Sequence, residues 1–159
     1  LYGVYDLMIG QVMGRSRTGV KNNLIITGKE TAMQIEQISV FMENKSGRLS
    51  EVTAVLAEAG INVKAMILAD LSDFGVLRMI VDDPQKAKDH LKHQGFVVNS
   101  AAVFSLDFDN APNGTQKVLE SLNQGGINVE YMYAFADMEK GKTTMVFMVD
   151  DPKKASKLI

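Results

Sequence analysis

The hydrophobic pattern of the chain changes its period several times, and each change predicts a new element. Strict alternation in "QIEQISVFM" (34–42) predicts a strand with Ile38, Val40 and Met42 on one face. After the turn sequence "NKSGR", apolar residues recur at helical spacing, and Gly60 is placed to end that helix. Two β-rich runs follow around a short turn, then a helix that begins at Asp-Pro, then the strand "FVVNSA". The predicted order is strand, helix, strand, strand, helix, strand.

The same pattern occurs twice, and such a repeat decides the architecture. A shift of 66 residues takes Gly-Ile-Asn-Val at 60–63 onto the same letters at 126–129, and takes "ISVFMEN" onto "FSLDFDN". The sequence "VDDP" at 81–84 recurs at 149–152, a shift of 68 residues. The second copy therefore contains two extra residues, which we expect in the polar turn "DMEKGKT" at 137–143.

The repeat predicts an α+β protein of two ferredoxin-like βαββαβ units, each an antiparallel four-stranded sheet with two helices on one face. One set of strand residues should face those helices: Ile38, Val40, Leu77, Met79 and Val81, with Phe104, Leu106, Met145, Phe147 and Val149 in the second copy. The opposite face is half apolar and needs a cover. We expect the sheets to stack between copies or between chains.

The copies place the units at residues 33–101 and 102–159, and the second unit is C-terminally incomplete because it stops inside its second helix. Without a last strand, residues 103–108 would have an unpaired edge. We therefore expect either a chain cut short or an edge filled by another segment. Residues 1–32 match neither copy and are either a vector or read-through extension or a genuine N-terminal strand or arm.

Composition narrows the class of protein. The 159 residues are 46% hydrophobic, with a net charge of −2 and a pI of about 5.7, so the chain lacks the one-signed charge that favours nucleic acid. No apolar run approaches the roughly 20 residues that cross a membrane. The chain contains no cysteine, which excludes disulfides and thiolate metal sites and is typical of a reducing cytoplasm. We expect a cytoplasmic protein.

The first turn, "ENKSGRLSEV", has the chemistry of a carboxylate site. Gly47 allows close approach of the backbone, and the following helix presents free N–H groups and the positive end of its dipole. Asn62 offers an amide donor and acceptor, and we expect it near the same edge of the layer. A ligand with one carboxylate and one ammonium would be matched there. The alternative is structural: Gly60 ends the helix in the left-handed conformation and Ile61 packs back.

The stretch "SVFMENKSGRLSEVTAVLAEAGINVKAM" resembles the opening of an ACT domain, with its acidic-Asn-x-x-Gly turn and its Gly-Ile-Asn before the second strand. The resemblance covers residues 34 to about 101 as a complete unit and 102–159 as an incomplete one. It implies a non-catalytic regulatory protein without a cofactor. Such a protein binds an amino acid or similar small carboxylate where ACT domains pair, within one chain or in a homodimer, and can regulate a metabolic enzyme.

The family's ligand positions carry over to matching residues of both copies. They are Asn44, Ser46, Gly47, Arg48, Leu49, Ile61 and Asn62, then Asn110, Pro112, Asn113, Gly114, Thr115, Ile127 and Asn128. The second copy departs from the pattern, because Asn113 stands where Gly47 would be and Thr115 replaces Leu49. Asn tolerates the left-handed conformation, so we expect the turn to survive there.

Other residue groups favour structural roles. His90 and His93 have helical i, i+3 spacing but no evident third metal ligand, and the acids of "VDDP" are suited to cap a Pro-started helix. The basic stretch "GRSRTGVK" at 14–21 suits a flexible tail.

Two other functions compete with amino-acid sensing. An acyl-phosphate hydrolase would use Arg48 to bind the anion and Asn62 to position water, yet the second copy has Gly114 at the place of Arg48. An RNA-binding sheet needs stacking aromatics and a basic surface. Only Tyr131, Tyr133 and Phe135 favour it.

Overall fold

The computed structural model describes residues 32–71, 73–137 and 141–158. The nature of the extension expected at 1–32 therefore falls almost entirely outside the described residues. The elements follow in the order β1 (Met33–Glu43), α2 (Arg48–Glu58), β2 (Val63–Leu71), β3 (Phe74–Val81), α3 (Pro84–His93), β4 (Val97–Asp109), α4 (Gly114–Gln124), β5 (Val129–Asp137), β6 (Lys142–Val149) and α5 (Pro152–Ala155). The predicted order of elements is confirmed, and the two units form an α+β fold.

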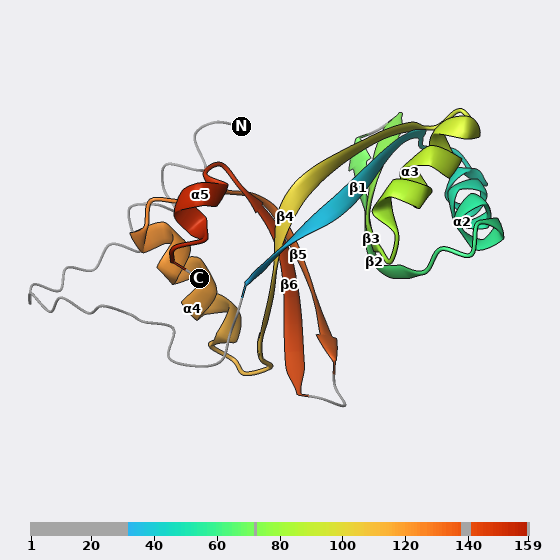
Figure 1. Cartoon of the computed structure of the whole chain (residues 1–159). Helices are drawn as coiled ribbons and strands as arrows, with labels where there is room; N and C mark the ends of the chain where they lie inside the picture. The colour runs from blue at the N-terminus through green and yellow to red at the C-terminus, as the bar shows by residue number, and fades with distance from the viewer. Residues whose placement is uncertain (1–31, 72, 138–140, 159) are drawn as a thin grey trace, which may run out of the picture.

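The strands form one antiparallel sheet of six strands in the order β2-β3-β1-β4-β6-β5. Figure 1 shows β1 and β4 crossing the middle of the molecule, with α2 and α3 at one end and α4 and α5 at the other. The first unit uses β2, β3, β1 and the start of β4, whereas the second uses the end of β4, β6 and β5. The boundary expected between residues 101 and 102 thus falls inside β4, which is a single strand of 13 residues.

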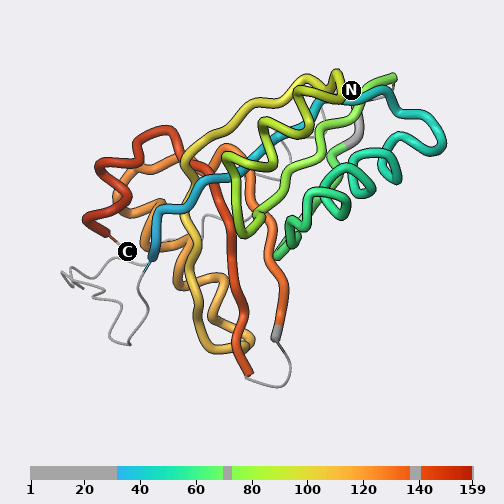
Figure 2. The backbone as a smooth tube through the Cα atoms, turned by 45° about the vertical axis from the view of Figure 1, so that its right-hand side comes forward, coloured from blue at the N-terminus to red at the C-terminus, as the bar shows by residue number. Residues whose placement is uncertain are grey.

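Part of the edge that the missing last strand would leave open is filled by β1, which pairs with β4 as far as Ser105. The first half of β1 runs alongside the middle of β4, so that Met33 lies opposite Ser105 and Ile35 opposite Val103. The second half of β1 pairs with β3 in the first unit, where Val40 lies opposite Leu77. Figure 2 shows the two long strands side by side. Pairing with another segment of the chain is therefore confirmed for residues 103–105 of this edge.

The two extra residues of the second copy lie where they were expected. Residues 72–73 connect β2 to β3, whereas residues 138–141 connect β5 to β6. Both copies keep strands of the same length on either side, so the insertion changes only the turn. A surface turn is where a chain tolerates added residues.

Each unit has its own core between the sheet and its helices. In the first unit, Val52 and Leu56 of α2 and Ala87 and Leu91 of α3 pack on strand residues, and in the second, Val118 and Leu122 of α4 and Ala155 of α5 do so. All the residues predicted to face the helices are buried there: Ile38, Val40, Leu77, Met79, Val81, Phe104, Leu106, Met145, Phe147 and Val149. The period-2 pattern assigned the strand faces correctly.

The opposite face of the sheet is partly covered by the chain itself, although Phe41 on this face is 46% exposed. The sheet curls until β5 approaches β1 and β3, and Ile80, Val103 and Val146 form a third buried cluster with half-buried tyrosines around it. The guanidinium of Arg78 in β3 lies 4.2 Å from the ring centre of Tyr131 in β5. Stacking between the copies is thus confirmed in this region. Pairing between chains stays a prediction for sedimentation analysis.

A buried glutamine fixes this contact between the two units. Gln37 is fully buried, and its Nε2 donates to the Tyr131 hydroxyl at 2.7 Å. The Tyr133 hydroxyl donates to Gln37 Oε1 at 3.0 Å. Burial raises the pKa of Tyr133, so this hydroxyl keeps the proton that it donates. Both ends of the amide are satisfied, as a buried polar group requires.

Candidate ligand site at the first turn

The turn between β1 and α2 is held by backbone contacts to the neighbouring hairpin. The Asn44 N–H donates to the Asp73 carbonyl at 2.9 Å, and the Arg48 N–H donates to the Lys45 carbonyl at 3.3 Å. Gly47 precedes the helix with φ of 91°, in the left-handed region that glycine adopts without steric cost. The sequence "NKSG" therefore folds into a tight turn that sets where α2 begins.

The first turn of α2 presents unused donors. Gly47 has no side chain to cap the helix, and no acceptor in the described part of the chain receives the backbone N–H of Leu49 or Ser50. These N–H groups lie at the positive end of the helix dipole. They are available to a carboxylate.

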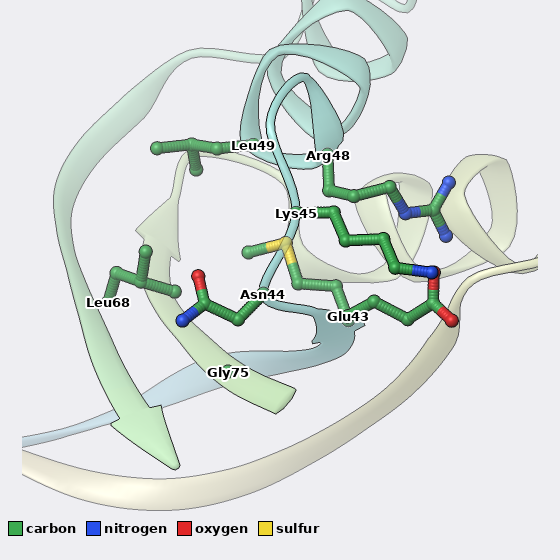
Figure 3. A pocket seen from close by; sticks show the side chains of 8 residues that line it. Glu43, Asn44, Lys45, Arg48, Leu49, Leu68 and Gly75 are labelled. Carbon is green, nitrogen blue, oxygen red and sulfur yellow. The ribbon is translucent and has the colours of Figure 1, made fainter. Parts of the chain in front are cut away.

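A small hollow with a volume of about 50 Å³ lies beside this turn. That volume is well below the roughly 300 Å³ at which sites for drug-sized ligands begin, so the hollow suits only a small ligand that stays partly in water. Figure 3 shows the Leu49 side chain above the Asn44 amide, the Leu68 side chain beside that amide, and Gly75 below it. The complete lining is Met42, Glu43, Asn44, Lys45, Arg48, Leu49, Leu68 and Gly75. The hollow lies between the start of α2 and the β2–β3 hairpin.

The charged groups of the hollow lie on one side of it. Glu43 and Lys45 form an ion pair at 3.2 Å, and both are largely exposed. Arg48 Nη1 lies 2.5 Å from Glu51 Oε2, and its guanidinium carbon lies 5.2 Å from the ring centre of Phe96. Figure 3 shows the Arg48 side chain directed away from Leu49 and Leu68. Arg48 therefore supplies its backbone and side-chain stem to the hollow, while its Nη1 is paired with Glu51 and its buried Nε has no hydrogen-bond partner among the described residues.

The sequence-based prediction found part of this lining. Asn44, Arg48 and Leu49 line the hollow, whereas Ser46 and Gly47 form the turn itself. Met42, Glu43, Lys45, Leu68 and Gly75 were missed. Leu68 and Gly75 belong to a hairpin that carries no recognisable motif. The sequence signal that could have found them is the difference between the copies, which have Ala134 at the place of Leu68 and Thr143 at the place of Gly75.

The expectation that Asn62 lies near the first turn is wrong. Glu43, just before that turn, pairs with Phe74 at the start of β3, whereas Val63 pairs with Val81 at its end. Asn62 therefore lies at the opposite end of the sheet from the turn. Because α2 runs between the two places over 11 residues, about 16 Å of helix separates them. The hydrolase alternative loses its pair of Arg48 and Asn62 for the same reason.

The two repeated motifs, Gly-Ile-Asn and "VDDP", are joined by a hydrogen bond in each copy. Gly60 has φ of 66° and the Ile61 N–H donates to the Leu56 carbonyl at 2.9 Å, so Gly-Ile-Asn ends the helix with Ile61 buried. The Asn62 N–H then donates to Asp82 Oδ1 at 3.0 Å. In the second copy the Ile127 N–H donates to the Leu122 carbonyl at 2.9 Å, and the Asn128 N–H donates to Asp150 Oδ1 at 3.1 Å. The structural alternative for Gly-Ile-Asn is confirmed in both copies.

The second acid of each "VDDP" caps a helix, as predicted. Asp83 Oδ1 accepts the Lys86 N–H at 2.9 Å, and Asp151 Oδ1 accepts the Lys154 N–H at 2.9 Å. In both helices proline occupies the first turn, where its missing N–H costs nothing. Removing such a cap costs about 0.5–2 kcal/mol.

The corresponding turn of the second copy survives in a different conformation. The Asn110 N–H donates to the Gly141 carbonyl at 2.9 Å and the Gly114 N–H donates to the Ala111 carbonyl at 3.0 Å, as in the first copy. Asn113 has φ of −105°, so the expected left-handed conformation is wrong at this position. Pro112 and Thr115 are exposed on this turn. Ile127 and Asn128 lie at the far end of the sheet, as their counterparts do.

The remaining candidates do not assemble a site. No group of three or more potential metal ligands occurs among the described residues, and His90 Nδ1 lies 2.9 Å from the Lys86 carbonyl oxygen. The Tyr131 and Tyr133 hydroxyls are bonded to Gln37, which works against stacking on RNA bases. In the part of the chain that the structure describes, no helix combines the length and apolar character needed to cross a membrane.

Comparison with known proteins identifies close structural relatives. A family model described as an ACT domain pair matches residues 33–159. The crystal structure of protein BT0572 from Bacteroides thetaiotaomicron is 42% identical, covers 80% of this chain and 87% of its own, and superposes with a TM-score of 0.76. No curated protein matches.

Two more distant structures share the fold. The ligand-free regulatory subunit of aspartate kinase from Thermus thermophilus is 17% identical, with a TM-score of 0.59 over 80% of this chain and 93% of that one. Aspartokinase III of E. coli, in complex with lysine and aspartate, is 14% identical, with a TM-score of 0.52 over 81% of this chain and 31% of that one.

Proposed function

The chain belongs to the ACT domain pair family, and on that premise we propose that it is a regulatory protein that binds a free amino acid in the hollow beside the first turn. The observation that carries the proposal is the combination of that hollow with the two unused N–H groups of Leu49 and Ser50. Family membership supplies the regulatory role. The hollow is the proposed place of the ligand.

The two charged groups of an amino acid find complementary partners in this hollow. The α-carboxylate is placed at the start of α2, where free N–H groups and the helix dipole both favour an anion. The ammonium is placed toward the Glu43 carboxylate and the Asn44 side-chain oxygen. Glu43 is available because its exposed ion pair with Lys45 contributes at most about 1 kcal/mol.

The walls of the hollow favour an apolar side chain on the ligand. Leu49 and Leu68 are 39% and 46% exposed, and Met42 and Gly75 close the inner side. A ligand that covers the two leucines removes apolar surface from water, at about 25 cal/mol per Å². A charged ligand side chain placed against the two leucines would lose part of its hydration, because the charged lining groups lie on the other side of the hollow. We therefore place small apolar amino acids ahead of acidic and basic ones.

The proposed biological role is control of a separate enzyme of amino-acid metabolism. In this role, ligand binding orders the start of α2 and the β2–β3 hairpin, and that surface signals to the enzyme. The absence of cysteine suits a reducing compartment, and we place the protein in the cytoplasm.

A thermal-shift screen against the twenty common L-amino acids tests this function. A ligand at one hundred times its dissociation constant stabilises the folded chain by about 2.7 kcal/mol, which raises the melting temperature by several degrees. We expect apolar amino acids to produce this shift and lysine, arginine, aspartate and glutamate to produce none.

Matched analogues provide the control for the screen. The amine that lacks the carboxylate of the best amino acid should give no shift, because nothing would then occupy the N–H groups of Leu49 and Ser50. An unchanged melting temperature with all twenty amino acids would reject the function.

A further inference from the structure

We propose that each chain binds a single ligand, in the first unit, because Phe108 and Thr143 close the corresponding hollow of the second unit. The inference rests on the proposed function, since it concerns the same kind of site. The inference states how many ligands each chain binds and which residues set that number. Neither the repeat nor family membership specifies either.

The strand registers show which residues occupy equivalent places. In the first unit, Met42 near the end of β1 lies opposite Gly75 near the start of β3. In the second unit, Phe108 near the end of β4 lies opposite Thr143 near the start of β6. Met42 and Phe108 come just before the turn into a helix, whereas Gly75 and Thr143 come just after a hairpin connection. The second unit therefore carries a larger residue at both positions of the pair.

In the first unit, the missing side chain of Gly75 leaves the hollow open. Gly75 is buried, and a Cβ added to it would come 3.1 Å from Leu68 Cδ1 and 3.6 Å from the Ala69 carbonyl oxygen. A β-branched side chain at this position would therefore displace Leu68, one of the two leucine walls. A single added Cβ would require the exposed Leu68 side chain to shift by only a few tenths of an ångström, and a larger side chain would require more.

In the second unit, Thr143 occupies the place that Gly75 leaves open. Its side chain is 9% exposed, and its hydroxyl donates to Asn110 Oδ1 at 3.2 Å. Asn110 is the counterpart of Asn44, which lines the first hollow. The threonine hydroxyl therefore binds the equivalent amide of the second unit. The threonine thus fills space and satisfies a polar group with one side chain.

Phe108 closes the same place from the side of the helix. It is 2% exposed, and its ring lies against the start of α4. A Cβ added to Gly114 would come 2.7 Å from Phe108 Cδ2 and 2.9 Å from the Asp109 carbonyl oxygen. The phenylalanine therefore needs glycine at the position that Arg48 holds in the first unit. The Phe108 ring thus depends on Gly114, and Phe108 lies opposite Thr143 in the strand register.

The apolar walls are also absent from the second unit. Thr115 and Ala134 stand at the places of Leu49 and Leu68, and both are exposed. Even an opened hollow would offer the ligand side chain less apolar surface there. The two copies have therefore diverged, one toward a site and the other toward a filled core.

Isothermal titration calorimetry of the whole chain tests the proposal. The probes are the L-amino acids that raise the melting temperature in the twenty-member screen. We expect one molecule bound per chain. Gly75→Thr, which gives the first unit the residue of the second, should abolish the heat of binding. Leu68→Ala, at a half-exposed wall, should weaken binding about tenfold without unfolding the chain.

Matched variants of the second unit separate the possible outcomes. Ala134→Ser changes the position equivalent to Leu68 and should leave both the stoichiometry and the affinity unchanged. Two molecules per chain would overturn the inference while leaving the proposed function intact. A single site that survives both Gly75→Thr and Leu68→Ala would overturn the inference and also the placement of the ligand in this hollow. No heat with any of the twenty amino acids would overturn both.

Discussion

Replacing Phe147 with alanine is expected to lower the free energy of unfolding by about 3–5 kcal/mol. Phe147 is fully buried in β6, and its ring stacks on Phe104 of β4 with the ring centres 5.7 Å apart. The substitution leaves a cavity beneath α4 that its close-packed neighbours fill only in part. Denaturant unfolding followed by circular dichroism measures the loss.

The same variant tests whether the two units unfold together. Because β1 and β4 contribute to both units, loss of the second core should destabilise the first. Hydrogen exchange of Phe147→Ala should then show amides of β3 losing protection by the same free energy as amides of β6. Full wild-type protection of the β3 amides would contradict the conclusion that β1 and β4 couple the unfolding of the two units. Phe74→Ala is the control, since Phe74 is 59% exposed and its loss should cost no more than about 1 kcal/mol.

Replacing Gln37 with leucine is expected to cost about 2–4 kcal/mol. Leucine nearly fills the volume of the glutamine, so the cost arises from the Tyr131 and Tyr133 hydroxyls, which lose their partner in the contact between units. A buried polar group without a hydrogen bond carries a desolvation penalty. Chemical denaturation measures the loss, and Gln34→Leu, at an exposed position of the same strand, should change stability little.

A triple variant distinguishes lost hydrogen bonds from lost packing. Adding Tyr131→Phe and Tyr133→Phe to Gln37→Leu removes the unpaired hydroxyls, so most of the lost stability should return. If the triple variant is as unstable as Gln37→Leu alone, the network is not what joins the units at this place.

Residues with a strict period, or with a motif repeated in both copies, were predictable from the sequence. Ile38 and Phe147 reached the cores because alternation alone decides which face of a strand is buried. The capping role of Asp83 followed from the proline after it. Such features depend on neighbours close in the sequence.

Features that depend on distant pairing were not predictable. Nothing local in β1 indicates that Ile35 pairs with the second unit while Val40 pairs with the first, because a long strand can be shared in several registers. The position of Asn62 was misjudged because α2 carries the chain to the other end of the sheet. Leu68 and Gly75 entered the hollow only through the hairpin that brings them to the first turn.

The measurement that tests the central claim most directly is an amide-resolved NMR titration of the chain with the amino acid that stabilises it most. We expect the largest chemical-shift changes at the N–H groups of Leu49 and Ser50, with little change at Thr115 and Gln116 of the second unit. Changes centred on Asn62 or Asn128, or equal changes at both helix starts, would contradict a single site at the first turn.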